Sequence, residues 1–427
     1  MVINYKGGEK MKLCFKFKPV LNELQLNIIN ELSFHTTALY NIANYDCIND
    51  KPQSYYDMNK KYSHNWHKDF LHSHAYQHCL KVLDKNWKSY FSAIKDYKKN
   101  PSKYLGCPRP PKYKNNNDRK NEIIFTNLAI RFKDNTLMLS LSKTMQSTYG
   151  VKSLNFEVSD KLQSLVDFNN LQQIKIKWDS VAKEWYLIII YNKQEYVLDS
   201  SYSNTMAIDL GLNNLATLTF LDSSESYIIN GKPVKATNSY INKEISKLQS
   251  IEMKCKKTSK IKDTKAITRL RRYRTNYMNN YFHKSSTEIV NKALQHKCNT
   301  IVIGDIKGIK QSMDFNKNFV QIPIQRLAEL IMYKAQLQGI EVLKVKESYT
   351  SGCSAIDLED INKTNYNKTR RVYRGLFKTN TDLLVNADVN GSLNILRLHI
   401  KDKCIPRPLI EARDNGYVSN PIMLRVA

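Results

Sequence analysis

Three acidic residues stand at positions from which they could act together. Asp209 lies near the end of an apolar run, Glu347 directly follows a second apolar-basic run, and Asp388 falls in the first turn of an expected helix. By itself Asp209 could equally open a β-turn, but three converging carboxylates provide the oxygen ligands that Mg²⁺ and Mn²⁺ prefer. Two such ions can clamp the attacking water and the leaving oxygen of a phosphodiester. The trio therefore predicts two-metal hydrolysis of a nucleic-acid backbone.

Apolar runs predict the elements that must position these acids. Two strands joined by a turn are expected within 206–220, and further strands at 300–305 and 340–346. A helix over 324–337 should end at Gly339, because glycine is typical just after a helix. The order strand, helix, strand implies a right-handed parallel crossover, so the last two strands should be neighbours with their carboxyl ends at one sheet edge.

The charge of the chain favours a nucleic-acid partner. Its 427 residues include 66 Lys and Arg against 39 Asp and Glu, a formal net charge of +27. Such an excess destabilises a compact protein unless a polyanion neutralises it. Apolar runs such as 185–191 are far too short to span a bilayer, and the start of the chain has no apolar leader. We therefore expect a cytoplasmic protein, associated with the nucleoid of a prokaryote, and no membrane partner.

Basic residues gather in two segments. Prolines make the linker near 101–120 extended, and its cations suit a phosphate backbone and a solvated loop equally well. The run 254–274 holds ten cations and one aspartate, which favours a surface that faces nucleic acid over a merely solvated one. From these segments the residues predicted to contact nucleic acid are Lys112, Lys114, Arg269, Arg271, Arg272 and Arg274.

Several segments, in this order, resemble the TnpB family of transposon-encoded RNA-guided nucleases, which are related to the type V CRISPR effectors. They are the linker 104–114 and the motifs Ala207–Gly211, Asn279–Ser286, Glu347–Ser351 and Asn386–Gly391. The resemblance implies a RuvC-like nuclease domain with an RNase H fold. It also implies an N-terminal β-barrel carrying a helical insert, a bound guide RNA, and recognition of a short motif beside the DNA target.

The expected fold class is therefore α/β plus β-barrel, with the boundaries taken from the strand and helix patterns. The wedge barrel is expected at 1–20 and 101–200, and the helical recognition insert at 21–100. The RuvC-like domain should occupy 201–349 and 386–400, with a target-nucleic-acid-binding insert at 350–385. Residues 401–427 are expected to form a flexible tail.

One departure from the family concerns the second catalytic acid. Most members place it on the strand that here reads Ile303-Gly304-Asp305, and Gly304 offers no side chain. A subset of the family carries a rearranged glutamate just before a Tyr-Thr-Ser motif, where Glu347 stands. Neighbouring strands lie only about 4.8 Å apart, so a glutamate can reach across. Asp305 is the competitor, although strand alternation points it to the face opposite residue 304. We assign catalysis and metal binding to Asp209, Glu347 and Asp388.

A second departure concerns zinc. Many relatives carry four cysteines between the Tyr-Thr-Ser motif and the last aspartate, whereas Cys353 stands alone here, and the chain has no Cys-x-x-Cys. We therefore expect no structural zinc. The remaining cations expected to contact nucleic acid are Lys284 in the second motif and, in the insert, Arg370, Arg371 and Arg374.

The sequence thus predicts an RNA-guided DNA endonuclease of transposon origin. It should cut guide-complementary DNA next to a short flanking motif, with one copy of the chain per RNA, although the sequence does not fix that number. Two alternatives stay open. A nuclease-inactive RNA-guided repressor is disfavoured by the survival of all three acids, and a transposase with a similar acidic triad would act without RNA.

Overall fold

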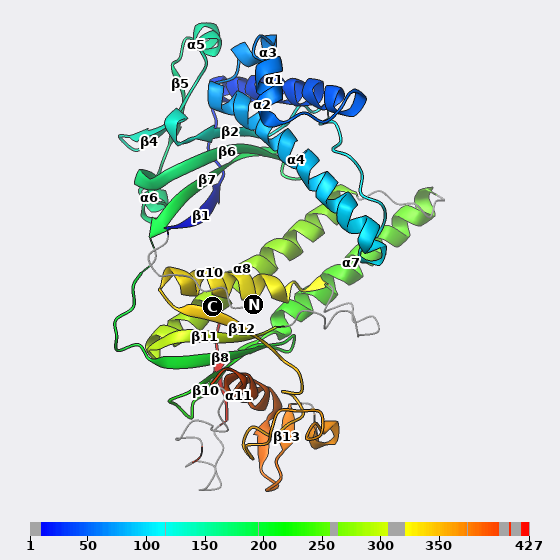
Figure 1. Ribbon diagram of the computed structural model, residues 1–427, viewed down its shortest axis with the longest axis vertical. Coiled ribbons are helices and arrows are strands. Elements are labelled where there is room, and N and C mark those ends of the chain that lie inside the picture. Colours follow the sequence, from blue (N-terminus) through cyan, green and yellow to red (C-terminus); the bar gives the residue numbers. More distant parts are fainter. Residues whose placement is uncertain are drawn as a thin grey trace. The chain divides into compact units, whose positions relative to one another are not determined.

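The computed structural model describes residues 10–115, 117–194, 196–256, 264–305, 321–373, 375–400, 410 and 420–426 (Figure 1). The chain divides into two compact units, one formed by Lys10–Lys193 and one that begins at Gln194. This division falls close to the boundary predicted at residue 200. Each unit has a hydrophobic core of its own.

The strands of the first unit form two open sheets. The four-stranded sheet has the order β1 (Lys10–Phe17), β7 (Glu184–Gln194), β6 (Leu171–Asp179), β2 (Ile123–Thr126). The three-stranded sheet consists of β3 (Ile130–Lys133), β4 (Thr136–Ser140) and β5 (Ser153–Glu157). Within the described part of the chain β1 and β2 are edge strands that do not pair with each other, so the predicted closed barrel is not present there.

Four helices fill the range expected to be helical. They are α1 (Glu23–Asn49), α2 (Tyr55–Lys61), α3 (Trp66–Asp69) and α4 (Ser73–Lys99). α1 begins with a capping box, in which the Asn22 side chain accepts from the Gln25 amide and the Gln25 side chain accepts from the Asn22 amide, both at 2.8 Å. Shorter helices are α5 (Lys143–Tyr149), α6 (Asp160–Leu165) and the 3₁₀ turns η1 (Pro101–Lys103), η2 (Asn127–Ala129) and η3 (Phe168–Asn170).

The second unit is built on one six-stranded mixed sheet. Its order is β12 (Glu341–Lys346), β11 (Cys298–Asp305), β8 (Asn204–Leu210), β9 (Asn214–Phe220), β10 (Ser226–Asn230), β15 (Ile422–Leu424). β11 runs parallel to both β12 and β8, while β9 returns antiparallel beside β8. The predicted neighbouring strands of the crossover are confirmed, and α10 (Ile324–Leu337) lies between them in the chain, with Gly339 in the left-handed region at φ 76°.

Helices cover both faces of this sheet. Met206, Ile208 and Leu210 share a core with α8 (Lys265–Gln295) and α10, while Ala207 packs with α11 (Ala387–Ile400) on the other face. Strand alternation accounts for this division. α7 (Lys232–Lys256) precedes α8 in the chain, and Thr264 caps the start of α8 by accepting from an amide of its first turn.

The C-terminal region differs in part from the expected flexible tail. Most of 401–427 lies outside the described residues, but Ile422–Leu424 form strand β15, which pairs parallel with β10. β10 has an edge that β9 does not use, and the apolar residues of β15 complete it.

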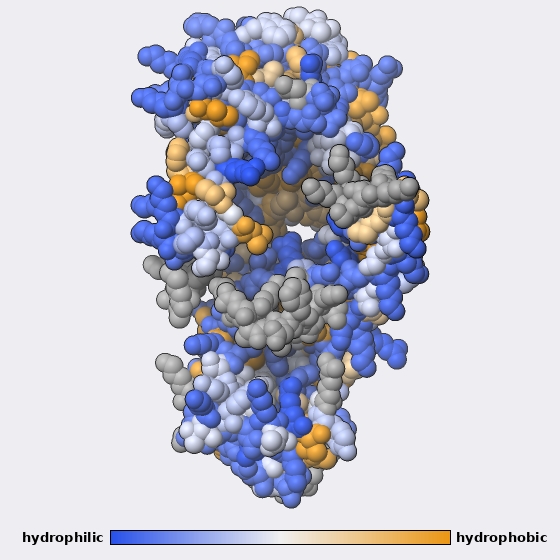
Figure 2. All heavy atoms as spheres, turned by 90° about the vertical axis from the view of Figure 1, so that its right-hand side faces the viewer, coloured by the Kyte–Doolittle hydropathy of each residue, from blue (hydrophilic) through white to orange (hydrophobic). Residues whose placement is uncertain are grey.

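No helix in the described parts of the chain is long and apolar enough to cross a membrane. Figure 2 shows one face of the molecule, on which hydrophilic residues predominate and hydrophobic ones are scattered.

Candidate active site

Asp209 occupies the position next to last in β8, and its side chain points toward α11. The burial of Ile208 and Leu210 against α8 and α10 leaves Asp209 on the opposite face of the strand. Gly391 on α11 allows this arrangement, because a Cβ at that position would lie 2.8 Å from Asp209 Oδ2. Ser392 fixes the helix, since its hydroxyl lies 3.1 Å from the Ala207 carbonyl oxygen and 3.2 Å from that of Thr217. α11 is thereby held against the end of β8.

Glu347 reaches across β11 to fill the place of a missing side chain. β11 lies between β12 and β8, and Gly304 pairs in register with Val345 of β12. A Cβ built on Gly304 would lie 1.5 Å from Glu347 Oε1 and 2.3 Å from Glu347 Cδ. The carboxylate of Glu347 therefore occupies the position into which a side chain at residue 304 would project. The structure brings this acid to the strand where the sequence has only glycine.

The acids of this edge influence one another electrostatically. Burial, followed by the neighbouring charges of Glu347 and Asp388, raises the pKa of Asp209 well above its ordinary value, while Arg371 acts in the opposite direction. Burial, with the charge of Asp305 added, raises the pKa of Glu347 to about 7. The three predicted acids are thus close enough to form one electrostatic cluster, and Asp305 lies at its margin.

Asp388 is held by two protein groups. Asn214 Nδ2 donates to Asp388 Oδ2 at 2.7 Å, and an Arg371 guanidinium nitrogen lies 3.4 Å from Asp388 Oδ1. Asn386 caps the start of α11, because its side-chain oxygen accepts from the backbone amides of Asp388 and Val389 at 3.0 and 3.2 Å. Both carboxylate oxygens of Asp388 are therefore engaged.

The donor set suits a hard divalent cation, although its side chains are not gathered around one. Glu347 Oε1 is buried without a hydrogen-bond partner, and an anionic oxygen in that state is stabilised by a cation. Among the described residues, no three Asp, Glu, His or Cys side chains are placed closely enough to hold a metal ion as they stand. The contact of Arg371 with Asp388 Oδ1 gives one physical reason, since the guanidinium takes an oxygen that a metal would use.

The other cations predicted to contact nucleic acid lie in different settings. Lys112, Arg269, Arg271 and Lys284 are exposed, whereas Arg272 is half-buried. The half-buried Lys114 places its ammonium 4.9 Å from the centre of the Tyr40 ring. Arg274 donates to Asn242 Oδ1 at 3.0 Å. Arg374 lies outside the described residues.

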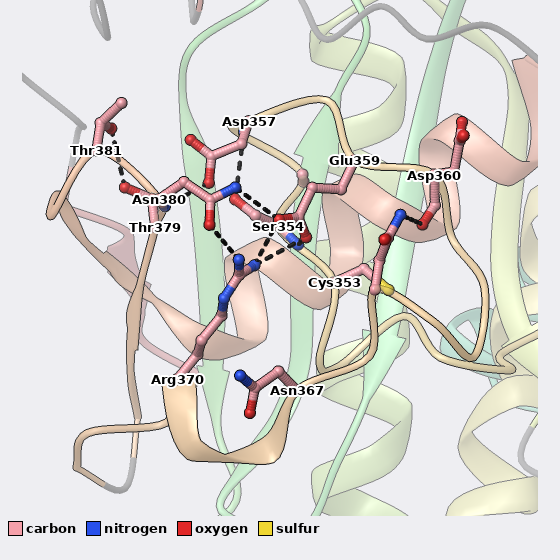
Figure 3. A network of polar contacts seen from close by, with 12 residues as sticks. Cys353, Ser354, Asp357, Glu359, Asp360, Asn367, Arg370, Thr379, Asn380 and Thr381 are labelled. Atoms are coloured by element: carbon pink, nitrogen blue, oxygen red, sulfur yellow. Dashed lines mark hydrogen bonds and ion pairs between the residues drawn. The ribbon is translucent and has the colours of Figure 1, made fainter.

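Arg370 has an internal role in the insert that precedes α11. It belongs to the turn η5 (Lys368–Arg370), beside a hairpin of β13 (Leu376–Lys378) and β14 (Leu384–Asn386). Its guanidinium donates to both carboxylate oxygens of Glu359, at 2.7 and 2.8 Å, and also bonds Asn380 (Figure 3). Arg370 thus forms an ion pair within the fold, and its contact with nucleic acid stays a prediction.

The same network connects the loops of the insert. Asn380 donates to Glu359 Oε1 and, through its backbone amide, to Asp357 Oδ2, each at 2.7 Å (Figure 3). Burial alone would raise the pKa of Glu359, but hydrogen bonds from Ser354, Arg370 and Asn380 lower it below its ordinary value. These bonds join separate segments of the insert to one another.

Some residues of the site were missed by sequence reasoning. Asn214 and Ser392 contact the site through tertiary pairing, which no local pattern in the sequence signals. Asn386 and Gly391 lie inside the quoted motif, and their spacing around Asp388 is that of a helix cap and a close helix–strand contact. A small residue three positions after an acid at a helix start was the available signal.

Comparison with known families agrees with this architecture. Residues 190–310 match the family OrfB_IS605, described as probable transposase, and residues 325–395 match the Cas12f1-like TNB domain. A solved structure of a Cas12f1–sgRNA–target DNA complex superimposes with a TM-score of 0.62 at 15% identity, covering 88% of this chain and 83% of that one. The chain thus has the mixed α/β architecture of a Cas12 effector.

Two curated proteins with similar sequences are CRISPR-associated endodeoxyribonucleases. The CRISPR-associated endodeoxyribonuclease Cas12f1 of Sulfoacidibacillus thermotolerans is 27% identical over 224 residues, which are 51% of this chain and 51% of that protein. The Cas12f1 of Syntrophomonas palmitatica is 29% identical over 205 residues, 45% of this chain and 39% of that protein. The matches therefore span about half or less of each relative. The chain is a TnpB-like relative of the type V effectors.

Proposed function

We propose that this chain is an RNA-guided DNA endonuclease that hydrolyses phosphodiesters at the edge formed by β8, β11 and α11. The observation that carries the proposal is the Glu347 carboxylate, which takes the place of the side chain missing at Gly304 and lies beside Asp209. An acid with no catalytic or metal-binding role would gain nothing from burial without a hydrogen-bond partner. The names of the curated relatives, all endodeoxyribonucleases, support the same reaction.

Asp209, Glu347 and Asp388 would hold the metals in this proposal. Two Mg²⁺ or Mn²⁺ ions, when bound, supply charge stabilisation at the attacking and leaving oxygens. The chain contributes the fixed positions of the three carboxylates. Gly391 and Ser392 hold Asp388 close to Asp209, and the Gly304 backbone leaves room for Glu347.

Arg371 is placed to respond to substrate. It is 44% exposed and contacts Asp388, so a phosphate of the bound strand can exchange with the carboxylate as its partner. That exchange would free Asp388 Oδ1 for a metal. We retain Arg371, together with the exposed Lys112, Arg269, Arg271 and Lys284, as residues that contact nucleic acid.

The proposed partners are a guide RNA and a complementary DNA target with a short flanking motif. The protein would contact the backbones while base pairing supplies sequence choice. The superimposed Cas12f1 structure contains an sgRNA and target DNA, which supports this choice for a chain of net charge +27. Structural zinc is absent from the proposal, because the network around Arg370 and Glu359 connects the insert.

The test is cleavage of a target plasmid by the purified protein–RNA complex with Mg²⁺. We expect cutting by the wild type, no cutting by Asp209→Asn, Glu347→Gln or Asp388→Asn, and residual cutting by Asp305→Asn. Target binding without any cutting would support the repressor, and strand transfer that survives removal of the RNA would support the transposase. Cutting that persists in Glu347→Gln but not in Asp305→Asn would move the second acid to Asp305.

A further inference from the structure

Three tyrosines form a row on α8. Tyr273, Tyr277 and Tyr281 follow one another at intervals of four residues, so they lie on neighbouring turns of one side of the helix. The ring centres of Tyr273 and Tyr277 are 6.4 Å apart with planes at 29°, and those of Tyr277 and Tyr281 are 6.5 Å apart with planes at 17°. We call these three side chains the tyrosine row.

The tyrosine row winds from the exposed side of α8 toward the sheet. A spacing of four exceeds the helical repeat of about 3.6 residues, so each step rotates the position by about 40° around the axis. Tyr273 is 58% exposed, while Tyr281 packs at the border of the core that α8 shares with the sheet. Arg269 continues the row one turn earlier and is exposed, as is the nearby Arg271. The outer end of the row is therefore aromatic and cationic.

The inner end of the tyrosine row lies at the same edge of the sheet as the acids, on the face opposite Asp209. The Tyr281 hydroxyl donates to the carbonyl oxygen of Asn230 at 2.5 Å, and the next residue, Gly231, donates its amide to the Asn213 carbonyl oxygen at 2.7 Å. Asn213 belongs to the turn between β8 and β9, which directly follows the end of β8 where Asp209 stands. Each turn of α8 toward Tyr273 then leads about 5.4 Å farther along the helix.

Aromatic faces interspersed with arginines are the surface that unpaired nucleotides bind. Bases stack on aromatic rings without regard to sequence, and arginine contacts both the phosphates and the rings. A protein partner matched to this helix would have to be strongly acidic. Because the tyrosine row ends at the same edge of the sheet as the acids, the nucleotides that fit it best are those of the strand to be cut.

We propose that the tyrosine row is a stacking path for single-stranded target DNA and leads that strand to the sheet edge at which β8 ends and the carboxylates stand. The inference rests on the proposed nuclease function and adds the residues that position its substrate. The bases of the strand stack on Tyr273 and Tyr277, and Arg269 contacts a phosphate at the outer end. Tyr281, fixed by its bond to Asn230, anchors the row at the sheet.

The experiment measures single-stranded DNA affinity in the assembled protein–RNA complex, with Asp209→Asn in the background to prevent cutting. The probe is a labelled oligodeoxythymidine, which cannot pair with the guide. Loss of one stacked base typically weakens binding by about fivefold or more. We expect this loss for Tyr273→Ala and for Tyr277→Ala. Tyr273→Phe keeps the ring and should change affinity little. Asn279→Ala alters an exposed residue of the same helix outside the row and should leave affinity unchanged.

Two further readouts separate the outcomes. In the cleaving protein, the tyrosine-to-alanine variants should lower the single-turnover rate while guide RNA affinity stays at the wild-type value. Reduced guide RNA affinity with unchanged DNA binding would assign the row to the guide and overturn the proposal, as would unchanged affinity for both. Failure of the wild-type protein to cut would overturn the proposed nuclease function. If the wild type cuts and the alanine variants cut equally fast, only the proposed role of the tyrosine row is overturned. Tyr273 is 58% exposed, so Tyr273→Ala keeps the test valid if Tyr277→Ala unfolds.

Discussion

The substitution Gly304→Ala tests the geometry of the site with a single methyl group. The new Cβ would lie 1.5 Å from Glu347 Oε1 and 2.6 Å from Glu347 Cγ, far inside van der Waals contact. Either the Glu347 side chain leaves its place or the strands separate. Separation costs about 1–3 kcal/mol of folding free energy, as overpacking of a well-packed site usually does. Displacement removes one carboxylate from the cluster, which we put at about 3 kcal/mol of transition-state stabilisation, or about a hundredfold in rate.

The assay is single-turnover cleavage of target DNA by the complex of protein, guide RNA and Mg²⁺, with thermal unfolding measured on the same samples. We expect Gly304→Ala to cut about a hundredfold more slowly and still bind target DNA. The Glu347→Ala variant should be equally slow, and adding Gly304→Ala to it should have no further effect, because the clashing carboxylate is gone. The double variant Gly304→Glu/Glu347→Ala, which returns an acid to β11, should cut faster than either single variant.

The reasoning has a clear refutation. Wild-type cleavage by Gly304→Ala would show that Glu347 does not occupy this place in the working enzyme. Additive effects of Gly304→Ala and Glu347→Ala on stability and rate would show the same, because residues that share one space do not act independently. In either case Asp305 would become the second acid to test.

Three further predictions concern charges around the site. Burial raises the pKa of Glu347 to about 7, so the folded protein holds a proton that the unfolded chain has released, and metal-free protein should lose stability as pH rises from near 4.5 to 7. Mg²⁺ should therefore raise the melting temperature more at about pH 8 than at about pH 5.5. Glu347→Gln should reduce this difference without abolishing it, because the pKa of Asp209 is raised as well. Arg371→Gln should tighten Mg²⁺ binding to the RNA-free protein by up to about fivefold, as measured by calorimetry, because the ion pair that it removes contributes about 0.2–1 kcal/mol. Unchanged affinity would contradict the proposal that Arg371 and the metal compete for Asp388. Arg370→Ala should destabilise the protein by about 3 kcal/mol, because the Glu359 carboxylate loses its cationic partner within the fold. A zinc chelator should leave the melting temperature unchanged. A lower melting temperature with the chelator would reveal a metal in the insert.

Local pattern predicted the parts of the fold that follow from short-range rules. The strands 300–305 and 340–346 are neighbours because a strand, helix, strand order permits few alternatives, and Gly339 ends α10 because it adopts a positive φ. The resemblance to the TnpB family pointed to Glu347 in place of the acid missing at Gly304, and the spacing of neighbouring strands permitted its reach. These features depend on residues close in sequence or on regular geometry.

Features that depend on long-range pairing were not predictable. The strands of the first unit alternate as a barrel strand would, but alternation does not tell whether the edge strands β1 and β2 close on each other. Likewise Arg370 stands in a basic segment typical of a nucleic-acid contact, and its pairing with Glu359 depends on how the insert folds back. Strand β15 completes the sheet with three residues, too few for a periodic signal.

The overlap between Gly304 and Glu347 also limits how this site can change over generations. A chain with a side chain at position 304 of β11 has no room for the Glu347 carboxylate. A chain with glycine at position 304 and no acid at position 347 lacks one carboxylate of the cluster. Any single-step route between the two arrangements therefore passes through a crowded or a depleted intermediate. Among descendants of a common ancestor, a bulky residue at position 304 and an acid at position 347 should exclude each other, and that exclusion should be visible wherever many such sequences are aligned.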